Sequence, residues 1–226
     1  MPRDMNALRL EQQDIARRVS LRNELAPLNQ LKTVAGADIS FNRFRTKGFA
    51  AIVVMSYPTG EIIEKASAIG ELDFPYIPGY LAFREWPLLE QCFNDLSITP
   101  DVLICDGQGI AHHRRAGLAA HVGVLSGLIT VGCAKSRLIG KYEEPAADKG
   151  SVSDLLHNNE KIGEVLRTRD RVKPLFISPG HRIDFKHSSQ LILSLCPKYR
   201  QPLPIQAAHN FVNQLRIANT PLPQDE

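Results

Sequence analysis

The stretch DVLICDGQG, residues 101–109, decides how this chain is expected to fold. It begins with a short apolar run that has an aspartate at each end, Asp101 and Asp106. An uninterrupted apolar run of this length is typical of a strand that is buried on both faces, and such strands are usually parallel and central in a sheet. The glycines at 107 and 109 then end the strand in a loop. We therefore expect a sheet with this strand near its centre and helices on its faces.

The residues upstream of this stretch predict an antiparallel meander. Two β-like runs, Val34–Phe41 and Phe49–Tyr57, are followed by a Pro-Thr-Gly turn and by a third run, Glu61–Ala68. A helix that Asp4 can cap, and that extends to about Asn23, precedes them. Three neighbouring strands are therefore expected ahead of the central one.

A second helix is predicted between the meander and the central strand. Residues 74–79, Phe-Pro-Tyr-Ile-Pro-Gly, hold two prolines close together, which excludes regular structure there. The helical pattern that follows extends from about Tyr80 to Leu96. Pro87 lies inside that pattern, so we expect a kink or a restart of the helix at this residue.

Helices and strands alternate after the central strand. We predict a helix at Arg114–Val124, a buried strand at Leu128–Cys133, a strand pair at Ile162–Arg169 and Pro174–Ser178, and helices at Ser188–Cys196 and Ile205–Ile217. This order predicts an α/β protein with a mixed central sheet and flanking helices. The length of 226 residues suits a single domain, with an N-terminal helical segment at 1–30 and a core at 34–217.

Composition excludes several classes of protein. The sequence is 43% hydrophobic and 23% charged, which is ordinary for a globular chain and excludes a disordered one. Lys and Arg number 27 and Asp and Glu number 24, so the net charge of +3 permits a polyanionic partner without arguing for one. The N-terminus has no apolar signal core, and the longest apolar stretch, 122–134, is too short to span a bilayer. We expect a cytosolic protein with no membrane partner.

The cysteines point to the same compartment. All four are far apart, with no CxxC pair and no cluster with histidine at zinc-site spacing. We interpret them as small buried hydrophobic side chains in a reducing environment. They are Cys92, Cys105, Cys133 and Cys196.

Three carboxylates lie where a core is expected. Asp38 is inside the run VAGADISF, Asp106 ends the central strand, and Glu85 lies near the start of the second helix. An ionised carboxylate is costly among apolar residues unless it is paired or binds a metal, and the carboxyl ends of strands in open α/β sheets are where ligands bind. Each acid alone has an ordinary alternative: a buried arginine partner for Asp38, a solvated helix face for Glu85 and a turn or cap for Asp106.

Taken together, the acids indicate a site for divalent cations. Carboxylates that converge on one point repel one another, and Mg²⁺ suits a few such oxygens together with substrate phosphate oxygens. Two ions about 4 Å apart can stabilise the attacking and leaving oxygens of a phosphodiester displacement. The acids therefore favour phosphodiester hydrolysis as the chemistry.

A basic run follows Asp106. His112-His113-Arg114-Arg115 is expected at a helix start, where free N–H groups and forked arginine donors would form a phosphate-binding patch. A basic surface helix is the alternative interpretation. Lys135, just past the strand Leu128–Cys133, would lie at a strand end like Asp106 and contact phosphate, or it is an ordinary surface lysine.

At this point the motifs match a known family. The chain resembles endonuclease V, the metal-dependent nuclease that recognises deaminated adenine (hypoxanthine) in nucleic acid. The resemblance extends in family order from about residue 8 to 215. It rests on GADIS at 36–40, PYIPGYLAFRE at 75–85, DGQGIAH at 106–112 with RRAGLAAHVG at 114–123, GCAK at 132–135 and SPGHR at 178–182.

The resemblance implies a fold, a reaction and a set of roles. It implies an RNase H-like fold, dependence on Mg²⁺ or Mn²⁺, cleavage of the second phosphodiester 3′ to the lesion, and action on DNA that contains deoxyinosine. Independently of the resemblance, a monomer is the plain expectation. Inosine-containing RNA is the alternative substrate. It places Asp38, Glu85 and Asp106 on metal-binding acids that are also catalytic, and His112, Lys135 and His209 on catalytic positions. It places Pro75, Tyr76, Ile77 and Pro78 on a strand-separating wedge, and Gly79, Leu81, Gly107, Gly109, Gly132 and Ala134 around a pocket for the lesion base.

Four positions depart from the usual family pattern. Many members have proline where His113 stands, and the position of Gln108 is often His or Asn. Cys133 replaces a common Val, and Gln206 stands where Arg is frequent. None of these positions is one of the three predicted metal-binding acids.

The wedge makes physical sense from the residues alone. Proline-fixed backbone would hold Tyr76 and Ile77 outward, and a rigid apolar wedge can unstack a base step. A Pro-rich loop whose tyrosine packs on the domain is the alternative. Two other classes of function are a non-catalytic nucleic-acid binder and a metal-independent hydrolase, although the sequence offers no GxSxG motif for the latter.

Overall fold

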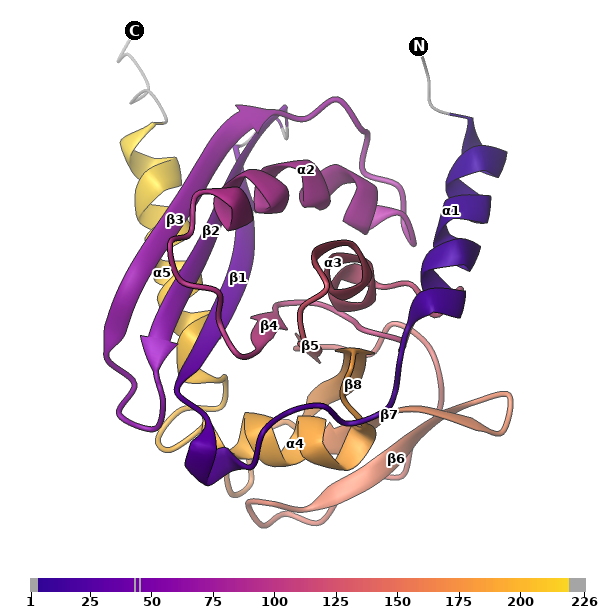
Figure 1. The fold of residues 1–226 in the computed structure, drawn as a ribbon. Helices are drawn as coiled ribbons and strands as arrows, with labels where there is room; N and C mark the ends of the chain where they lie inside the picture. The colour runs from indigo at the N-terminus through magenta and orange to yellow at the C-terminus, as the bar shows by residue number, and fades with distance from the viewer. Residues whose placement is uncertain (1–3, 43, 45, 220–226) are drawn as a thin grey trace, which may run out of the picture.

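One mixed sheet organises the molecule (Figure 1). The computed structural model of this protein describes residues 4–42, 44 and 46–219. Within them an eight-stranded sheet has the order β3-β2-β1-β4-β5-β8-β7-β6. The strands are β1 (Thr33–Phe41), β2 (Lys47–Ser56), β3 (Ile62–Glu71), β4 (Leu103–Cys105), β5 (Thr130–Ala134), β6 (Val152–His157), β7 (Glu160–Leu166) and β8 (Leu175–His181).

The predicted centre and meander of the sheet are confirmed. β4 pairs in parallel with both β1 and β5, and all three of its residues are buried. β1, β2 and β3 form the antiparallel meander. β6 was not predicted, because only one of its six residues is buried and its pattern therefore lacks an apolar run.

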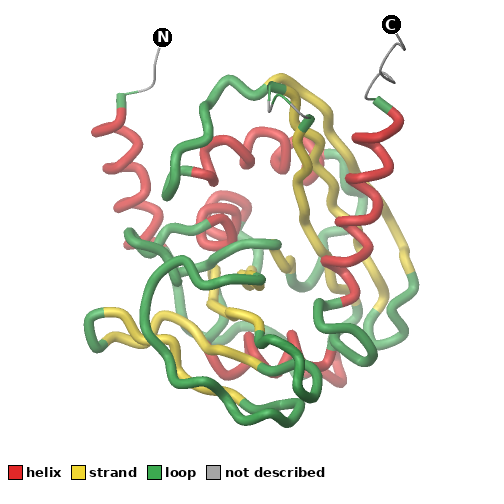
Figure 2. The backbone as a smooth tube through the Cα atoms, turned by 180° about the vertical axis from the view of Figure 1, so that it is seen from behind, coloured by secondary structure: helices red, strands yellow, loops and turns green. Residues whose placement is uncertain are grey.

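Helices cover both faces of the sheet. α2 (Leu81–Asn94) and α3 (Leu118–Ser126) pack with one set of core residues, and α4 (Phe185–Ser194) and α5 (Leu203–Ala218) pack with another. Figure 2 shows α5 lying over the strands of the meander. α1 (Met5–Arg18) buries Ile15 against Ala116 and Val124, beside α3. The single α/β domain with flanking helices is therefore confirmed.

Alternation along β1 decides which side chains meet α5. Val34 belongs to the core beneath α4 and α5, whereas Ala35 and Ala37 belong to the core beneath α2 and α3. Successive side chains of a strand point to opposite faces, so Asp38 shares the α5 face with Val34 and Gly36. A Cβ on Gly36 would lie 2.2 Å from the carbonyl oxygen of Pro204, so only glycine allows the start of α5 to approach β1 so closely.

Two predicted helix bounds are wrong, and of the two alternatives at Pro87 the restart is excluded while the kink stays a prediction. α1 ends at Arg18 rather than near Asn23, because Val19 takes an extended backbone. α3 begins at Leu118, not at Arg114, because residues 112–115 form a turn in which Arg115 has a φ of +57° and Gly117 is extended. α2 continues through Pro87 without a restart.

The cysteines behave as predicted. All four are free and buried, and burial raises the pKa of Cys92 and of Cys196 to about 12, so both thiols stay protonated near neutral pH. Across the described part of the chain, no helix combines the length and the apolar character needed to cross a membrane.

Candidate active site

Asp38 lies within β1, beside Asp106, which directly follows the end of the parallel strand β4. Ala37 pairs with Cys105 across β1 and β4, and the amide of Asp106 donates to the carbonyl of Ala37 at 3.2 Å. The two aspartates follow these paired residues directly, and neighbouring strands are about 4.8 Å apart. The register therefore brings both carboxylates to the α5 face at the carboxyl end of β4.

Glu85 brings a third carboxyl group from α2. Its side chain is buried, with a residue exposure of 6%. Burial first, and then the charges of Asp38 and Asp106, raise the pKa of Glu85 to about 8, and Arg84 partly opposes this. Burial and the charge of Asp106 also raise the pKa of Asp38. The charges of Asp38 and Asp106 thus both act on Glu85, so the three acids lie close together, as the sequence predicted for a convergent cluster.

Two cations or potential cations contact these acids. The Nζ atom of Lys135 lies 2.6 Å from Oδ2 of Asp106, and Nδ1 of His209 lies 2.7 Å from Oδ2 of Asp38. Lys135 follows β5, the parallel neighbour of β4, and His209 lies on α5. Both residues were predicted at this site, and the structure places both of them there.

A hydrogen-bonded chain behind His209 was missed by the sequence reasoning. Asn213, one helical turn after His209, places Nδ2 3.0 Å from Nε2 of the histidine. The hydroxyl of Ser40 donates to Oδ1 of Asn213 at 3.2 Å. The four-residue spacing on α5 was the available signal, but it has meaning only once β1 is known to lie beneath the helix.

The acids fit a divalent cation by their chemistry rather than by their present geometry. Among the described residues, no group of three or more His, Cys, Asp or Glu side chains is arranged to hold a metal ion. Lys135 and His209 each occupy an oxygen of one aspartate. Carboxylate oxygens nevertheless suit Mg²⁺. Burial first, and then neighbouring negative charge, raise the pKa values of Asp38 and Glu85, and a cation would relieve that charge.

The carbonyl oxygen of Gly79 is a junction between three segments. It accepts hydrogen bonds from Nε2 of Gln12 at 2.9 Å and from Nη2 of Arg114 at 2.8 Å, and it lies 3.1 Å from Nε2 of His112. Gly79 has a φ of +79°, a conformation that favours glycine. Gln12 is fully buried, and no sequence signal singled it out because α1 carries no other site residue.

His112 is neutral in this arrangement. Burial and the neighbouring Arg114 lower the pKa of His112 to about 4. Its Nδ1 accepts from the amide of Arg114 at 3.2 Å, which leaves Nε2 to donate to Gly79. A neutral imidazole of fixed tautomer shapes the wall of a site but carries no positive charge toward a phosphate.

Arg114 and Arg115 are not at a helix start as predicted. The guanidinium of Arg114 also hydrogen-bonds Gln12 and lies over the ring of Tyr80. Arg115 donates to Glu160 at 2.6 Å and to the carbonyl of His112 at 2.9 Å. Both side chains therefore hold loops together in this structure.

The proline-rich loop presents one aromatic side chain. Tyr76 is 55% exposed, and Pro75 and Pro78 are exposed on either side of it. Ile77 was expected to point outward with Tyr76, but it packs on the cluster of Leu8, Phe74 and Phe83. The loop is thus anchored through Ile77 and offers Tyr76 to the surroundings.

A small cavity of about 130 Å³ lies beside this loop. Among the six residues predicted for a base pocket, Gly79, Leu81 and Gly107 line it, together with the unpredicted Gln12 and Leu138. The other three, Gly109, Gly132 and Ala134, do not line it.

The absence of Gly109 and Gly132 from the cavity lining has a packing reason. A Cβ on Gly109 would lie 2.0 Å from the carbonyl oxygen of Pro179. A Cβ on Gly132 would lie 2.3 Å from the amide of Gly109. These glycines let three backbone segments touch beneath the site, and they support it without facing the cavity.

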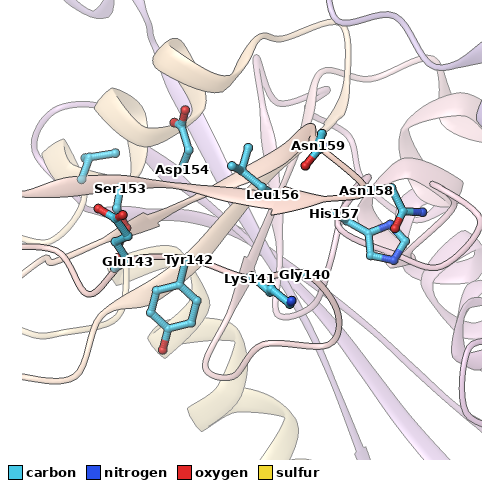
Figure 3. Close-up of a pocket in the computed structure, with 11 residues that line it drawn as sticks. Gly140, Lys141, Tyr142, Glu143, Ser153, Asp154, Leu156, His157, Asn158 and Asn159 are labelled. Carbon is cyan, nitrogen blue, oxygen red and sulfur yellow. The ribbon is translucent and has the colours of Figure 1, made fainter.

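A more spacious hollow lies elsewhere. A depression of about 880 Å³ lies along β6 and the segment 140–143, and Figure 3 shows Lys141, Tyr142, Asp154 and Leu156 around it. None of the predicted site residues lines it. The volume of a cavity would therefore have placed the candidate site away from the acids. The gathered carboxylates identify the site instead.

Comparisons with known proteins show which family this chain resembles. The family model described as Endonuclease V matches residues 13–210. The Endonuclease V of Dehalococcoides mccartyi (strain CBDB1) is 44% identical over 206 residues, 91% of each chain. The crystal structure of the Endonuclease V of Streptomyces avermitilis superposes with a TM-score of 0.92 at 39% identity, over 97% of this chain and 96% of the other. The crystal structure of Ciona intestinalis Endonuclease V superposes with a TM-score of 0.84 at 26% identity, over 96% of this chain and 99% of the other. That structure is a complex with a 24mer DNA containing an inosine followed by a ribo-adenosine.

The chain has an α/β sheet with three acids gathered beside one of its strand ends, and its relatives are endonucleases. Together these findings define the class of the protein as an endonuclease. The class of phosphodiester-cleaving enzymes predicted from the acids is thereby confirmed. More particularly, the chain belongs to the Endonuclease V family. The RNase H-like fold class that the resemblance implied is confirmed by the close superposition on the family's structures.

Proposed function

We propose that this protein is a divalent-metal-dependent endonuclease that acts as a monomer in the repair of deaminated DNA. Its substrate is hypoxanthine in DNA, and it hydrolyses the second phosphodiester 3′ to that base, leaving a 5′-phosphate and a 3′-hydroxyl. The observation that carries the proposal is the convergence of Asp38, Glu85 and Asp106 beside the end of β4, where the charges of Asp38 and Asp106 both act on Glu85. The inosine-containing DNA held by the Ciona intestinalis relative supports the choice of substrate.

Asp38, Asp106 and Glu85 would hold the metal ion through their oxygens. Bound Mg²⁺ or Mn²⁺ would supply Lewis-acid stabilisation of the phosphodiester oxygens and lower the pKa of water. Lys135 is positioned to stabilise charge on the phosphate, because its ammonium group already lies at the edge of the acid cluster. His209 orients Oδ2 of Asp38, and the amide of Ile39 donates to Oδ1 at 2.9 Å.

The small cavity suits a single extruded base. Gly79 and Gly107 line the cavity without side chains, so their backbone groups can lie close to a flat ring, and Leu81 adds an apolar side chain. Backbone amides and carbonyls there would read the O6 and N1–H edge that distinguishes hypoxanthine from adenine. His112 contributes to the wall as a neutral ring, and Arg114 fixes the carbonyl of Gly79.

Tyr76 is the wedge in this proposal. It is exposed at the mouth of the cavity and is held by a loop that Ile77 anchors to the core. Insertion of such a side chain unstacks a base step, and a base that pairs poorly costs least to extrude. Selectivity for a damaged base then arises partly from pairing energy and partly from the cavity.

The test uses four inosine-containing oligonucleotides. DNA and RNA, each single and double stranded, are incubated with the full chain in Mg²⁺ or in EDTA. Cleavage of inosine DNA one nucleotide beyond the lesion in Mg²⁺, and none in EDTA, is the expected result. Cleavage of the RNA substrates alone would show that the substrate is inosine-containing RNA. Binding of the oligonucleotides with no cleavage even in Mg²⁺ would show that the protein is a non-catalytic binder.

A further inference from the structure

A second, open groove begins at Lys135. It has a volume of about 770 Å³, and its lining includes Lys135, Arg137, Tyr142 and Lys173. The first two follow β5, Tyr142 follows in the same connection, and Lys173 precedes β8. Because β5 and β8 pair with Ala134 opposite Phe176, these segments meet at the same edge of the sheet as Asp106.

The charge of this groove is positive. Its one acidic lining residue, Glu144, is paired with Arg167 at 2.7 Å. Arg137 and Lys173 are exposed, and within residues 4–42, 44 and 46–219 neither has an ion pair. Two cations that face solvent without a carboxylate partner are suited to a polyanion.

An aromatic ring lines the same groove as these cations. Tyr142 packs edge-on against Phe176, with ring centroids 5.4 Å apart, and the guanidinium of Arg137 lies 5.7 Å from its centroid. The ring is only partly buried, and Figure 3 shows it pointing away from Asp154. A held aromatic beside basic side chains is the usual platform on which single-stranded nucleic acid stacks a base.

The floor of the groove is fixed in advance. Arg200 donates from Nε to the carbonyl of Lys173 at 2.7 Å, and from Nη2 to the carbonyls of Pro174 at 2.8 Å and Lys135 at 3.1 Å. One guanidinium thus ties the end of β5 to the start of β8. A preformed surface avoids the cost of ordering on binding.

The groove continues the path of the substrate strand. Leu138 lines the base cavity, Arg137 lines the groove, and Lys135 contacts Asp106 between them. We propose that the groove binds single-stranded nucleic acid on the 3′ side of the cleaved bond, with phosphates on Arg137 and Lys173 and a base on Tyr142. The 3′ direction rests on the proposed function, because cleavage there lies 3′ to the base held in the cavity.

Two inosine oligonucleotides of equal length test this assignment. The 3′-long strand has roughly three nucleotides on the 5′ side of the inosine and twelve on the 3′ side, and the 5′-long strand has the reverse. Only the 3′-long strand can fill a groove on the 3′ side. Their affinities for the full chain are measured by fluorescence anisotropy in EDTA, which prevents cleavage, over a series of salt concentrations. The variants are Arg137→Ala/Lys173→Ala and Tyr142→Ala. The control is Arg22→Ala/Lys32→Ala, which removes the same two charges at the opposite end of the strands.

The double groove variant should lose affinity for the 3′-long strand only. Its plot of log affinity against log salt should become less steep by about 1.4, since each lost phosphate contact on a single strand contributes about 0.7. Tyr142→Ala should weaken the same strand about tenfold without changing the slope. The control variant should match the wild type on both strands.

Equal losses on both strands, or a loss on the 5′-long strand alone, would overturn the assignment. So would a control variant that loses as much as the groove variant. The outcome separates from the proposed function, because binding in EDTA needs no catalysis. If the wild type cleaves no inosine substrate while the groove variant still loses the 3′-long strand, the proposed activity is wrong and the groove assignment stands.

Discussion

The Nδ1 atom of His209 lies 2.7 Å from Oδ2 of Asp38, although 171 residues separate them in the chain. The contact exists because Gly36 lets the start of α5 approach β1. Asn213 approaches the other ring nitrogen of His209 at 3.0 Å, and Ser40 donates to the amide oxygen of Asn213. The amide nitrogen of Asn213 therefore faces His209 as a donor, so the proton of the imidazole is on Nδ1, where it is shared with Asp38.

Asn213→Ala should disturb catalysis through His209 and not through the fold. Without the amide donor, Nε2 of His209 loses its hydrogen bond and Asp38 alone favours one tautomer, so the other tautomer gains population. The rate constant of cleavage should then fall about tenfold with little change in KM. The ¹⁵N chemical shifts of His209 in the metal-free protein report the tautomer directly. Unchanged shifts in the variant would show that Asn213 does not set it, and Asn219→Ala near the end of the same helix is the control.

Asp106→Asn should abolish cleavage while binding persists. The neutral amide removes one charged oxygen ligand from the acid cluster, and it also frees Lys135 from its ion pair. We expect the cleavage rate to fall by about 10³-fold or more, as for loss of a central electrostatic contribution to a transition state. Single-turnover cleavage and anisotropy binding measure the two effects. Asp95→Asn, an exposed change after α2, is the matched control, and activity within tenfold of wild type would contradict the site.

Glu85 should make the metal-free protein less stable as the pH rises. Its folded pKa of about 8 lies above the ordinary value of 4.5, so its contribution is fully present below about pH 4.5 and is lost as the pH rises toward 8. The loss amounts to about 1.4 kcal/mol per pH unit within that window.

Glu85→Gln removes this titration. In EDTA the variant should match the wild type in urea unfolding at pH 5 and should be the more stable of the two at pH 8. Glu90→Gln, an exposed change on the same helix, should leave the pH profile as it is. A Glu85→Gln profile parallel to that of the wild type would show that Glu85 does not titrate in this range.

Tyr76→Ala should impair duplex substrates more than single strands. The exposed ring is needed only where a base step must be unstacked, so single-stranded inosine DNA should be cleaved at nearly the wild-type rate. Tyr76→Phe retains the ring and should retain most duplex activity. Equal losses on both substrates would remove the wedge role and leave a role in the cavity wall.

Gly109→Ala should unfold the site rather than alter its specificity. The new Cβ would meet the carbonyl oxygen of Pro179 at 2.0 Å, and backbone on both sides prevents relaxation, so the free energy of unfolding should fall by more than about 2 kcal/mol. Gly127→Ala is the comparison: φ there is +74° and nothing lies within 4 Å of a Cβ, so only backbone strain of about 1 kcal/mol is added. Thermal or urea unfolding distinguishes the two, and similar losses would contradict the packing argument.

Local pattern was sufficient for some elements and not for others. The apolar run at 101–106 identified β4 because a strand buried on both faces must be apolar throughout. β6 has no such run, and its existence depends on pairing with β7. The start of α3 was placed four residues early because the positive φ of Arg115 cannot be inferred from its side chain.

The sequence by itself determined the chemical identity of the site: three acids, a lysine and a histidine in a recognisable order, with the strands that carry two of the acids. Tertiary structure alone decided that Asp38 and Asp106 are adjacent, that His112 is neutral, that Arg114 supports Gly79, and that Gln12 and Asn213 belong to the site. The division has a physical reason. Periodicity and residue type report each segment's own preference for burial and backbone shape, whereas register, charge coupling and hydrogen-bond partners arise only between segments that are distant in the chain and meet on folding.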